Sequence, residues 1–388
     1  MAKGTRAFVP GLEGVPVAET VLSWVDGEKG RLVIAGRDVE DVALTATFEE
    51  ASALLLAGDD APPTAGDVKA AFGAAREAAH ERLPELGAAL DAPDAMDALR
   101  AAMAHLSEDR RPGVPPFLAA AKLVGAAPVF AAAWARKREG LPPVKPDRAA
   151  SHAADFLRIL RGAAATEEEV RALDTYLVTV VDHGLNASTF AARVVASTGS
   201  DLVSAVTAAI SALKGPLHGG APGPVLDMLD SVGDPSRAAE WLGSELDARR
   251  RIMGMGHRVY RTRDPRAAVL EVAVERLHRA LSAGRAESPA ARRLELARAV
   301  EREATSLLAA RHPNRALRAN VEFYTAVLLE ALGVPRELFS AVFAVARTVG
   351  WTAHVEEERR KGRLIRPTSI YVGPVPDSRH STKSRSLP

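Results

Sequence analysis

The sequence predicts a mostly α-helical protein with two interleaved domains and one small β-hairpin near the N-terminus. Alanine-rich segments such as AFGAAREAAHERL and FLAAAKLVGAAPVFAAAWARKREG favour helices that pack closely. A helical spacing of apolar residues begins near residue 47 and continues almost to the end of the chain. The length of 388 residues corresponds to about two to three folding units, yet no long linker separates them.

The elements follow from local signals along the chain. Residues 21–42 predict the hairpin, because two β-rich runs flank the turn at 26–30. Helix starts are marked by the capping residues Thr47, Thr166 and Asp201. Proline is tolerated in the first turn of a helix, so Pro265 and Pro335 are predicted to open two more helices. Residues 364–372 are predicted to form a short extended segment.

Composition and motifs exclude several classes of protein. Lys and Arg number 50 against 49 Asp and Glu, which argues against nucleic-acid binding. The absence of cysteine excludes disulfides, zinc–thiolate sites, iron–sulfur clusters and thiol nucleophiles. There is no Walker loop and no HExxH motif. The start MAKGTRAFVPGLEGV lacks an apolar signal-peptide core, and no apolar run approaches 18 residues. We therefore expect no membrane span and a cytoplasmic protein.

Three of the ten histidines lie in segments rich in glycine and proline rather than within helices. His183 lies in VVDHGLNAST, His218 in KGPLHGGAPGP and His257 in IMGMGHRVYRTRDPRA. Neighbouring glycines let a ligand approach the backbone closely, so these three are candidate site residues. Each one taken alone is also compatible with a structural loop histidine. His354 lies near the same helical face as Arg347, and we interpret it as a packing residue.

Glu322 and three arginines stand where a charged side chain needs an explanation. Glu322 directly precedes a strongly apolar helix, where burial would raise its carboxyl pKa and make it a base near neutral pH. It is equally compatible with a helix N-terminal carboxylate that favours the dipole. Arg347 interrupts an apolar pattern, and Arg266 stands in a first turn where cations are disfavoured. With Arg366 in the extended C-terminal segment, they suggest recognition of carboxylates or phosphates.

Several motifs occur in an order that is far more specific than any one of them. They are GLEGVPVAETVLSWVDGEKGRLVIAGRDVEDVA, DHGLNAST, GPLHGGAPGPVLDML, MGMGHRVYRTRDPRA, NVEFYTAVLL, FAVARTVGWTAH and RPTSIYVGP. In these motifs, and along nearly its whole length, the chain resembles the citrate synthase family.

The resemblance implies a fold, an assembly and a reaction. The fold would be almost all α, with a large domain at residues 1–218 and 327–388 and a mobile small domain at 219–326 on the CoA side. The protein would be a homodimer whose active site lies in the cleft between the domains. As an acyltransferase it would condense acetyl-CoA with oxaloacetate and hydrolyse the thioester. CoA would be substrate and product, with no permanently bound cofactor and no metal.

The resemblance also assigns roles residue by residue. The catalytic residues would be His218, His257 and Glu322, and Glu322 stands where the family has an aspartate. Oxaloacetate would be bound by His183, Arg266, Arg347 and, from the other subunit, Arg366. The CoA contacts would come from Arg261 and from the backbone of Ile252, Gly254, Met255 and Gly256. Val180 replaces a histidine common in the family, and no role carries over to it.

Three alternatives remain open. The substrate could be propionyl-CoA, giving 2-methylcitrate, because one methylene is worth only about 1–3 kcal/mol and the sequence does not locate its pocket. The chain could be a weakly active acyl-CoA-binding relative, because the longer Glu322 moves the carboxylate by roughly 1 Å and could cost about a hundredfold in rate. Finally, His183, His218, His257 and Glu322 could form a metal site.

Overall fold

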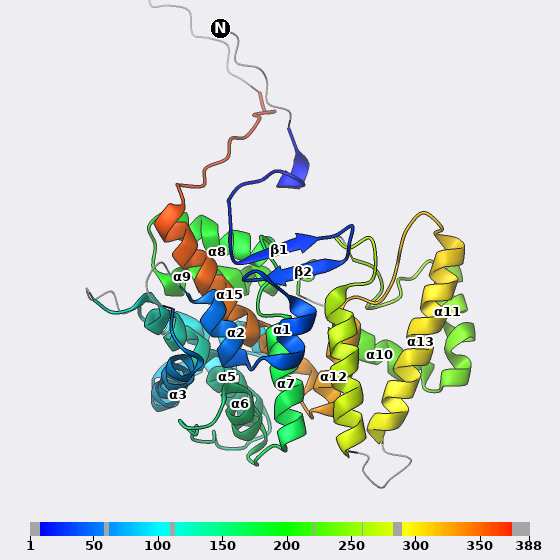
Figure 1. The fold of residues 1–388 in the computed structure, drawn as a ribbon, viewed down its shortest axis with the longest axis horizontal. Coiled ribbons are helices and arrows are strands. Elements are labelled where there is room, and N and C mark those ends of the chain that lie inside the picture. Colours follow the sequence, from blue (N-terminus) through cyan, green and yellow to red (C-terminus); the bar gives the residue numbers. More distant parts are fainter. Residues whose placement is uncertain are drawn as a thin grey trace, which may run out of the picture.

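The fold is mostly helical, as predicted. A computed structural model describes residues 8–57, 62–108, 113–219, 222–257, 259–281 and 289–374. Within this part of the chain, fifteen α-helices, four short 3-10 turns and one three-stranded sheet are present (Figure 1). Residues 375–388 lie outside the described residues.

The N-terminal sheet contains the predicted hairpin. Strands β1 (Ser23–Asp26) and β2 (Arg31–Ile34) pair antiparallel, and the short β3 (Arg37–Asp38), which the sequence did not indicate, adds to β2. The Asp26 carboxylate closes the turn by accepting a hydrogen bond from the Lys29 backbone at 3.0 Å. Leu32 and Ile34 are buried and fix the hairpin to the helical body.

The helices of the first half build the main body. They are α1 (Val39–Thr45), α2 (Phe48–Leu55), α3 (Ala65–Glu81), α4 (Ala95–Ala104), α5 (Pro116–Arg138), α6 (His152–Arg161), α7 (Glu167–Thr179), α8 (Ala187–Ser197) and α9 (Leu202–Leu213). The capping predictions are confirmed, because Thr47 and Thr166 form capping boxes and the Asp201 side chain accepts from the Ser204 backbone at 2.7 Å.

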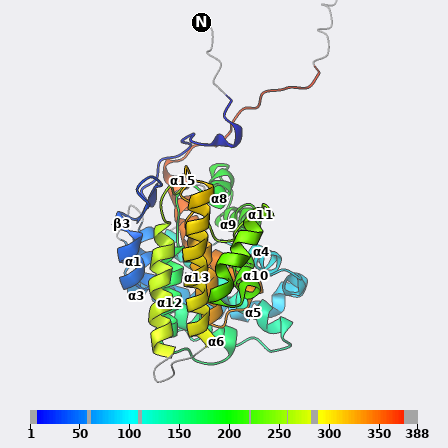
Figure 2. The same ribbon diagram turned by 90° about the vertical axis from the view of Figure 1, so that its right-hand side faces the viewer.

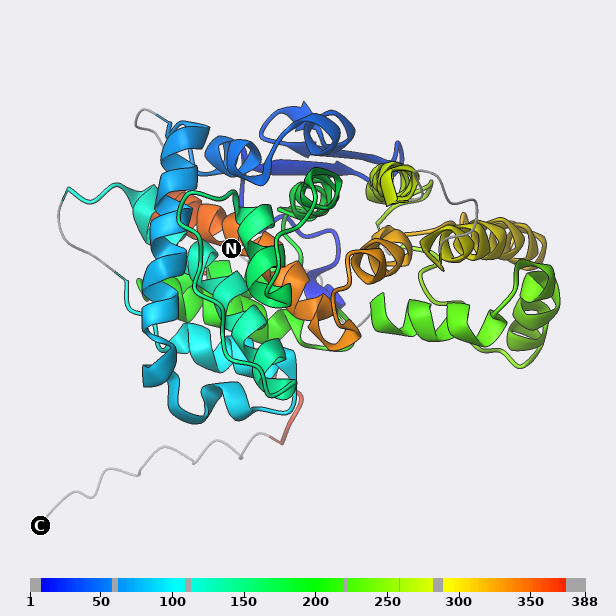
Figure 3. The ribbon, with the colours of Figure 1, turned by 90° about the horizontal axis from the view of Figure 1, so that it is seen from below.

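The helices of the second half include a group that stands to one side. They are α10 (Pro222–Val232), α11 (Ala238–Asp247), α12 (Pro265–Leu281), α13 (Pro289–Arg311), α14 (Val321–Ala331) and α15 (Phe339–Lys361). Helices α10, α11 and α13 project from the body, while α15 returns through its centre (Figures 1 and 3). The projecting helices fall within the expected small domain at 219–326, whose boundaries remain a prediction.

One predicted helix start is displaced. Pro265 opens α12 as expected, but the residues after Pro335 first form a 3-10 turn, Arg336–Leu338, and α15 begins at Phe339. Proline fixes the φ angle of its own residue and does not by itself select the α-helical hydrogen-bond pattern.

Helices α5 and α15 form much of the core. Pro116–Arg138 and Arg336–Lys361 are long and apolar enough to cross a membrane by length and composition, although no uninterrupted apolar run was found in the sequence. In the structure 83% and 89% of their most apolar windows are buried inside the protein. These two helices are therefore accounted for as core helices of the fold.

Both ends of the described chain leave the body as extended arms. Residues 8–20 and 362–374 run out on the same side of the molecule (Figures 1 and 2). The C-terminal arm is extended, as predicted for residues 364–372, and it exposes Ile370, Tyr371 and Val372.

Candidate active site

His183 and His257 come together although they lie in loops far apart in the sequence. His183 lies in the turn between α7 and α8, and His257 precedes α12. Their ring centroids are 5.8 Å apart, and His183 Nε2 lies 3.0 Å from the Tyr260 hydroxyl. The Tyr260 ring in turn lies 4.7 Å from that of His257. Tyr260, which the sequence analysis did not single out, thus holds the two predicted histidines together.

Arg266 adds a buried cation beside these rings. Its guanidinium donates to both oxygens of Asp264, at 3.0 and 2.8 Å, and Asp264 also accepts from the Val321 backbone at 3.2 Å. Arg266 lies in the first turn of α12, where the dipole disfavours it, and the buried Asp264 carboxylate compensates. The unfavourable position of this cation is thus balanced by a carboxylate of the chain itself.

His257 is held as a neutral hydrogen-bond donor. Burial lowers the pKa of His257 to about 4, and the positive charge of Arg266 contributes a smaller effect in the same direction. Its Nδ1 accepts from the backbone N–H groups of Val259 and Tyr260, at 3.0 and 3.2 Å, so the proton of the neutral ring is on Nε2. Nε2 lies 3.3 Å from Nη2 of Arg266. Two donors therefore converge where a ligand oxygen would satisfy both.

Glu322 is placed at the start of α14 by backbone pairing with the segment before His257. The Gly256 N–H donates to Arg318 at 2.7 Å, and the Asn320 N–H donates to Gly254 at 2.9 Å. The Asn320 side chain caps α14 by accepting from the Glu322 N–H at 3.0 Å. This pairing brings the Glu322 carboxylate to the same region as His257.

The Glu322 carboxyl group has the properties of a base that works near neutral pH. Burial raises its pKa to about 7, against the opposing effect of Arg266. Tyr176 on α7 is fully buried, and its hydroxyl has no partner within the described residues. Burial and the Glu322 charge raise the Tyr176 pKa well above its usual value.

Arg347 is the clearest sign of an anionic ligand. It is 1% exposed, and its Nε donates to the Val180 carbonyl at 2.7 Å. Its Nη2 has no hydrogen-bond partner in the described part of the chain. Burial lowers the Arg347 pKa to about 10, and the charge of Asp182 opposes this effect. A buried, charged donor without a partner is costly, so this position favours a bound carboxylate.

His218 is oriented by the first turn of α8. Its Nε2 accepts from the Ser188 backbone N–H at 3.3 Å and lies 2.9 Å from the Ser188 hydroxyl. Trp351 on α15 donates to the same hydroxyl at 3.1 Å. Burial lowers the His218 pKa to about 4, so the ring is neutral and its proton is on Nδ1. His218 thus offers an N–H donor away from Ser188.

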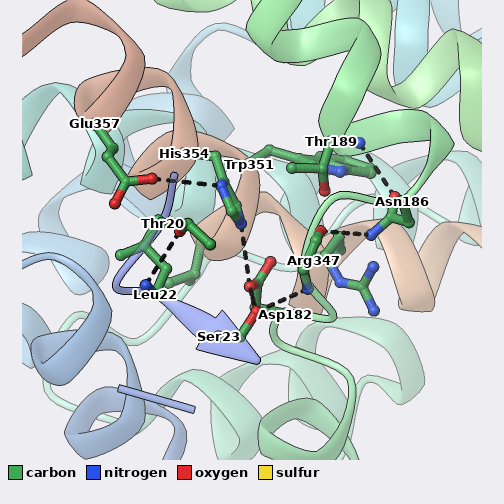
Figure 4. Close-up of polar contacts among 12 residues, drawn as sticks. Thr20, Leu22, Ser23, Asp182, Asn186, Thr189, Arg347, Trp351, His354 and Glu357 are labelled. Carbon is green, nitrogen blue, oxygen red and sulfur yellow. Dashed lines mark hydrogen bonds and ion pairs between the residues drawn. The ribbon is translucent and has the colours of Figure 1, made fainter. Parts of the chain in front are cut away.

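A buried polar network supports the turn that bears His183 (Figure 4). His354 Nε2 lies 3.1 Å from Asp182, and His354 Nδ1 accepts from the Arg193 guanidinium at 2.8–3.1 Å. Asp182 also accepts from the Ser23 hydroxyl, which accepts from the Gly184 N–H at 2.7 Å. His354 is therefore buried, as expected of a packing residue, but it also hydrogen-bonds directly behind the site.

Some of the predicted residues lie apart from this centre. Arg366 is exposed on the C-terminal arm, and the Arg261 side chain is 66% exposed near Glu28. Ile252 and Met255 are buried. The backbone groups of Gly254 and Gly256 that pair with residues 318–320 are already occupied, which leaves fewer of them for a CoA adenine than the sequence suggested.

The metal-site alternative finds no support in the geometry. Among the described residues, no three or more His, Asp or Glu side chains are grouped closely enough to hold a metal ion. His218 in particular directs Nε2 to Ser188 rather than towards His183.

Comparison with known proteins identifies the family. The family model for "Citrate synthase, C-terminal domain" matches residues 11–368. The chain belongs to the citrate synthase family. It is 40% identical over 380 residues to citrate synthase of Haloferax volcanii, covering 94% of this chain and 95% of that one. It is 35% identical over 371 residues to 2-methylcitrate synthase of Mycobacterium tuberculosis, covering 94% and 90%.

The fold agrees with a solved member of the family. The citrate synthase of Thermoplasma acidophilum, solved with carboxymethyl coenzyme A and oxaloacetate, matches with a TM-score of 0.83 and 30% identity, covering 96% of this chain and 98% of that one. The protein is thus an acyl-transferring enzyme of the citrate synthase type. The resemblance stated from the motifs is confirmed, and the relatives include both citrate and 2-methylcitrate synthases.

Proposed function

We propose that this protein is a citrate synthase, which condenses acetyl-CoA with oxaloacetate and hydrolyses citryl-CoA to citrate and CoA. The observation that carries the proposal is the buried Arg347, whose Nη2 has no hydrogen-bond partner among the described residues and which is close enough to Glu322 for their charges to interact. Oxaloacetate is a dianion, and a carboxylate with a pKa of about 7 suits removal of the weakly acidic α-proton of a thioester. The site therefore combines an anion receptor with a base.

The first step would form the nucleophile. Glu322 takes a proton from the acetyl methyl group, and charge develops on the thioester oxygen. The neutral His218 donates its Nδ1–H to that oxygen and stabilises the enol or enolate. Ser188 makes this possible, because its backbone N–H donates to Nε2 and so keeps the ring proton on Nδ1.

The second step would join the two substrates. His183, Arg266 and Arg347 hold oxaloacetate, and the Nε2–H of His257 hydrogen-bonds its ketone oxygen. The enol carbon attacks the ketone carbon, and His257 protonates the new alkoxide. A water molecule then attacks the thioester carbonyl of citryl-CoA. The C–S bond breaks, CoA leaves as the thiol, and the former thioester carbon becomes the third carboxylate of citrate.

The CoA side of the site is proposed from the resemblance. Arg261 would contact a CoA phosphate, and its guanidinium lies exposed at the surface beside Glu28. The backbone of Ile252–Gly256 would flank the adenine. Closure of the small domain at 219–326 would exclude water during condensation. CoA would act as substrate and product, with no permanently bound cofactor.

The assembly and setting are part of the same proposal. A homodimer would let Arg366 of one subunit complete the site of the other, and the exposed extended arm that carries Arg366 supports this. The absence of cysteine is compatible with a reducing compartment, and we propose the cytoplasm and the tricarboxylic acid cycle.

The second candidate is 2-methylcitrate synthase, which uses propionyl-CoA. The 35% identity to the Mycobacterium tuberculosis enzyme favours keeping it, and the same catalytic residues would serve. The weakly active relative remains a third possibility, because Glu322 replaces the family aspartate.

A steady-state assay tests these proposals. Acetyl-CoA and propionyl-CoA are compared, each with oxaloacetate, by following release of the CoA thiol. We expect a higher kcat/KM with acetyl-CoA, and losses of about 10²–10⁴-fold in His218→Ala and His257→Ala variants that stay folded. A preference for propionyl-CoA would favour the second candidate, and no condensation with either would refute both.

A further inference from the structure

We propose that the β1–β2 hairpin is a brace that joins the turn bearing His183 to the loop after His257 and sets their spacing in the arrangement that the structure shows. The proposal rests on the function proposed above, because it concerns how those two histidines are positioned. The residues that act are Ser23 at one end of β1 and Gly27 just beyond the other end. Neither is assigned a contact with substrate, so both are positioning residues.

At the first end, Ser23 fastens the hairpin to the turn that bears His183. Its buried hydroxyl donates to Asp182 and accepts from the Gly184 N–H at 2.7 Å, so it binds the residues on both sides of His183 (Figure 4). Gly184 has a φ of +58°, which makes the turn tight enough for both contacts. The extension of this network through His354 and Arg193 anchors Asp182 from behind.

At the second end, Gly27 lies directly against the loop after His257. The Arg261 N–H donates to the Gly27 carbonyl at 2.8 Å. A Cβ atom on Gly27 would lie only 2.3 Å from the Val259 carbonyl oxygen. Gly27 does not have a positive φ, so its lack of a side chain is needed for this close approach and not for the turn conformation. Gly30 also approaches Thr262 and Arg263 closely, but its φ of +64° means that the turn conformation favours glycine there as well.

The hairpin between these two ends is stiff, so a displacement of one end also displaces the other. Its register is fixed from Ser23 opposite Ile34 to Asp26 opposite Arg31, and Leu32 and Ile34 are fully buried. Gly27 lies four residues after Ser23, a span of roughly 13 Å along the strand. A paired strand of this length is stiff compared with the two loops that it touches.

The contacts form a closed ring, which explains why the brace matters. His183 touches Tyr260 directly, and the hairpin joins the same two segments by a second route. Without that route, the direct contact between the two histidine-bearing segments at this point would be one hydrogen bond and ring packing. A displacement of about 1 Å in such a site costs on the order of a hundredfold in rate.

The first test adds a methyl group at the contact. We expect Gly27→Ala to lower kcat by about ten- to a hundredfold, because the loop after His257 must move. The matched control is Gly243→Ala on α11, where a Cβ would meet nothing within 4 Å and φ is not positive. This control should keep kcat within about twofold of the native enzyme.

The second test removes the hydroxyl at the other end. Ser23→Ala should mainly raise the KM for oxaloacetate, because His183 is released. The control is Ser231→Ala, whose hydroxyl donates to the Asp227 carbonyl of its own helix. If the hairpin is one brace, the double variant S23A/G27A should lose less than the product of the two single losses, since either change already breaks the ring.

Hydrogen–deuterium exchange of the full-length protein separates this proposal from the proposed function. We expect Ser23→Ala and Gly27→Ala each to speed exchange in both 181–188 and 259–264, with no change on α11. A change confined to the hairpin, with kinetics within twofold of the native enzyme, would overturn the brace. If the native protein condenses neither acyl-CoA, the proposed function fails, yet the exchange measurement still decides whether the hairpin holds the two segments.

Discussion

At the scale of single residues, the main feature of the site is a buried positive charge that the surrounding residues neutralise only in part. In the part of the chain that the structure describes, Nη2 of the buried Arg347 has no hydrogen-bond partner, and burial lowers the Arg347 pKa to about 10. It nevertheless remains charged at neutral pH. A bound carboxylate would accept a hydrogen bond from Nη2 and would offset the free-energy cost of burying the charged guanidinium.

Arg347→Ala should therefore weaken oxaloacetate binding far more than CoA binding. Loss of a charge-assisted hydrogen bond is worth roughly 1.5–3 kcal/mol, or about ten- to a hundredfold in affinity. Calorimetric titration with each substrate measures both effects. Arg250→Ala, which removes an exposed arginine paired with Glu245, is the control. Equal losses for oxaloacetate and CoA in Arg347→Ala would indicate general damage.

The candidate residues were predictable where a charged residue interrupted an apolar helix, or where glycines interrupted the helical pattern. Arg347 in an apolar helix and His257 beside glycines carried such signals, and the structure places both at the site. Tyr260, Ser188 and Asp264 were missed because their roles depend on contacts across the fold. Asp264 offered one signal in retrospect, since a carboxylate directly before a helix-opening proline could compensate Arg266.

At the scale of elements, α8 and α15 meet in the buried network behind His183. Arg193 on α8 pairs with Glu357 and Glu358 on α15 and donates to His354. Because Nδ1 of His354 accepts from Arg193, the neutral ring donates from Nε2 to Asp182. His354 thus accepts a hydrogen bond from Arg193 through Nδ1 and donates one to Asp182 through Nε2.

His354→Gln should keep much of the oxaloacetate affinity, because its amide also offers one acceptor and one donor. His354→Leu should raise the KM for oxaloacetate about tenfold or more, since the buried Asp182 loses one of its two side-chain partners and keeps only Ser23. Steady-state kinetics and thermal unfolding of both variants provide the comparison. If the two variants fall in stability together while their KM values stay native, His354 is a packing residue only.

Element starts were predicted best where a side chain caps the helix. Thr47, Thr166 and Asp201 form the predicted caps because these contacts are local in sequence. The 3-10 turn at Arg336–Leu338 and the strand β3 were not predicted, because tertiary packing selects them.

At the scale of the whole molecule, the two extended arms leave side chains exposed that the rest of the same chain does not cover. Tyr371 and Val372 are 70% and 93% exposed, and Arg366 lies on the same arm away from its own site. An apolar arm of this kind needs a surface to cover it. A second copy of the chain is the partner that the proposed function requires.

Sedimentation should therefore give about twice the chain mass of 41.0 kDa. Arg366→Ala should lose most activity while remaining a dimer, and Arg363→Ala on the same arm serves as the control. An active monomer would contradict both the dimer and the shared site.

The overall architecture followed from the order of the motifs, since that order identified the family and therefore the fold. The assembly could not be tested by the same route, because a subunit interface is not visible in one chain. The acyl specificity was equally out of reach, since the two substrates differ by one methylene.

The central claim is that Glu322 works as the base of a condensing enzyme, despite its extra methylene. The most direct measurement is exchange of the acetyl-CoA methyl protons with solvent deuterium, with a dead-end analogue of oxaloacetate bound. With a pKa of about 7, Glu322 becomes ionised as pH rises, so exchange in the native protein should increase through pH 7 and level off above it. Glu322→Gln should abolish exchange, and Glu322→Asp should be slower than or equal to the native protein. Native-level exchange in Glu322→Gln, or a gain of tenfold or more in Glu322→Asp, would contradict the assignment.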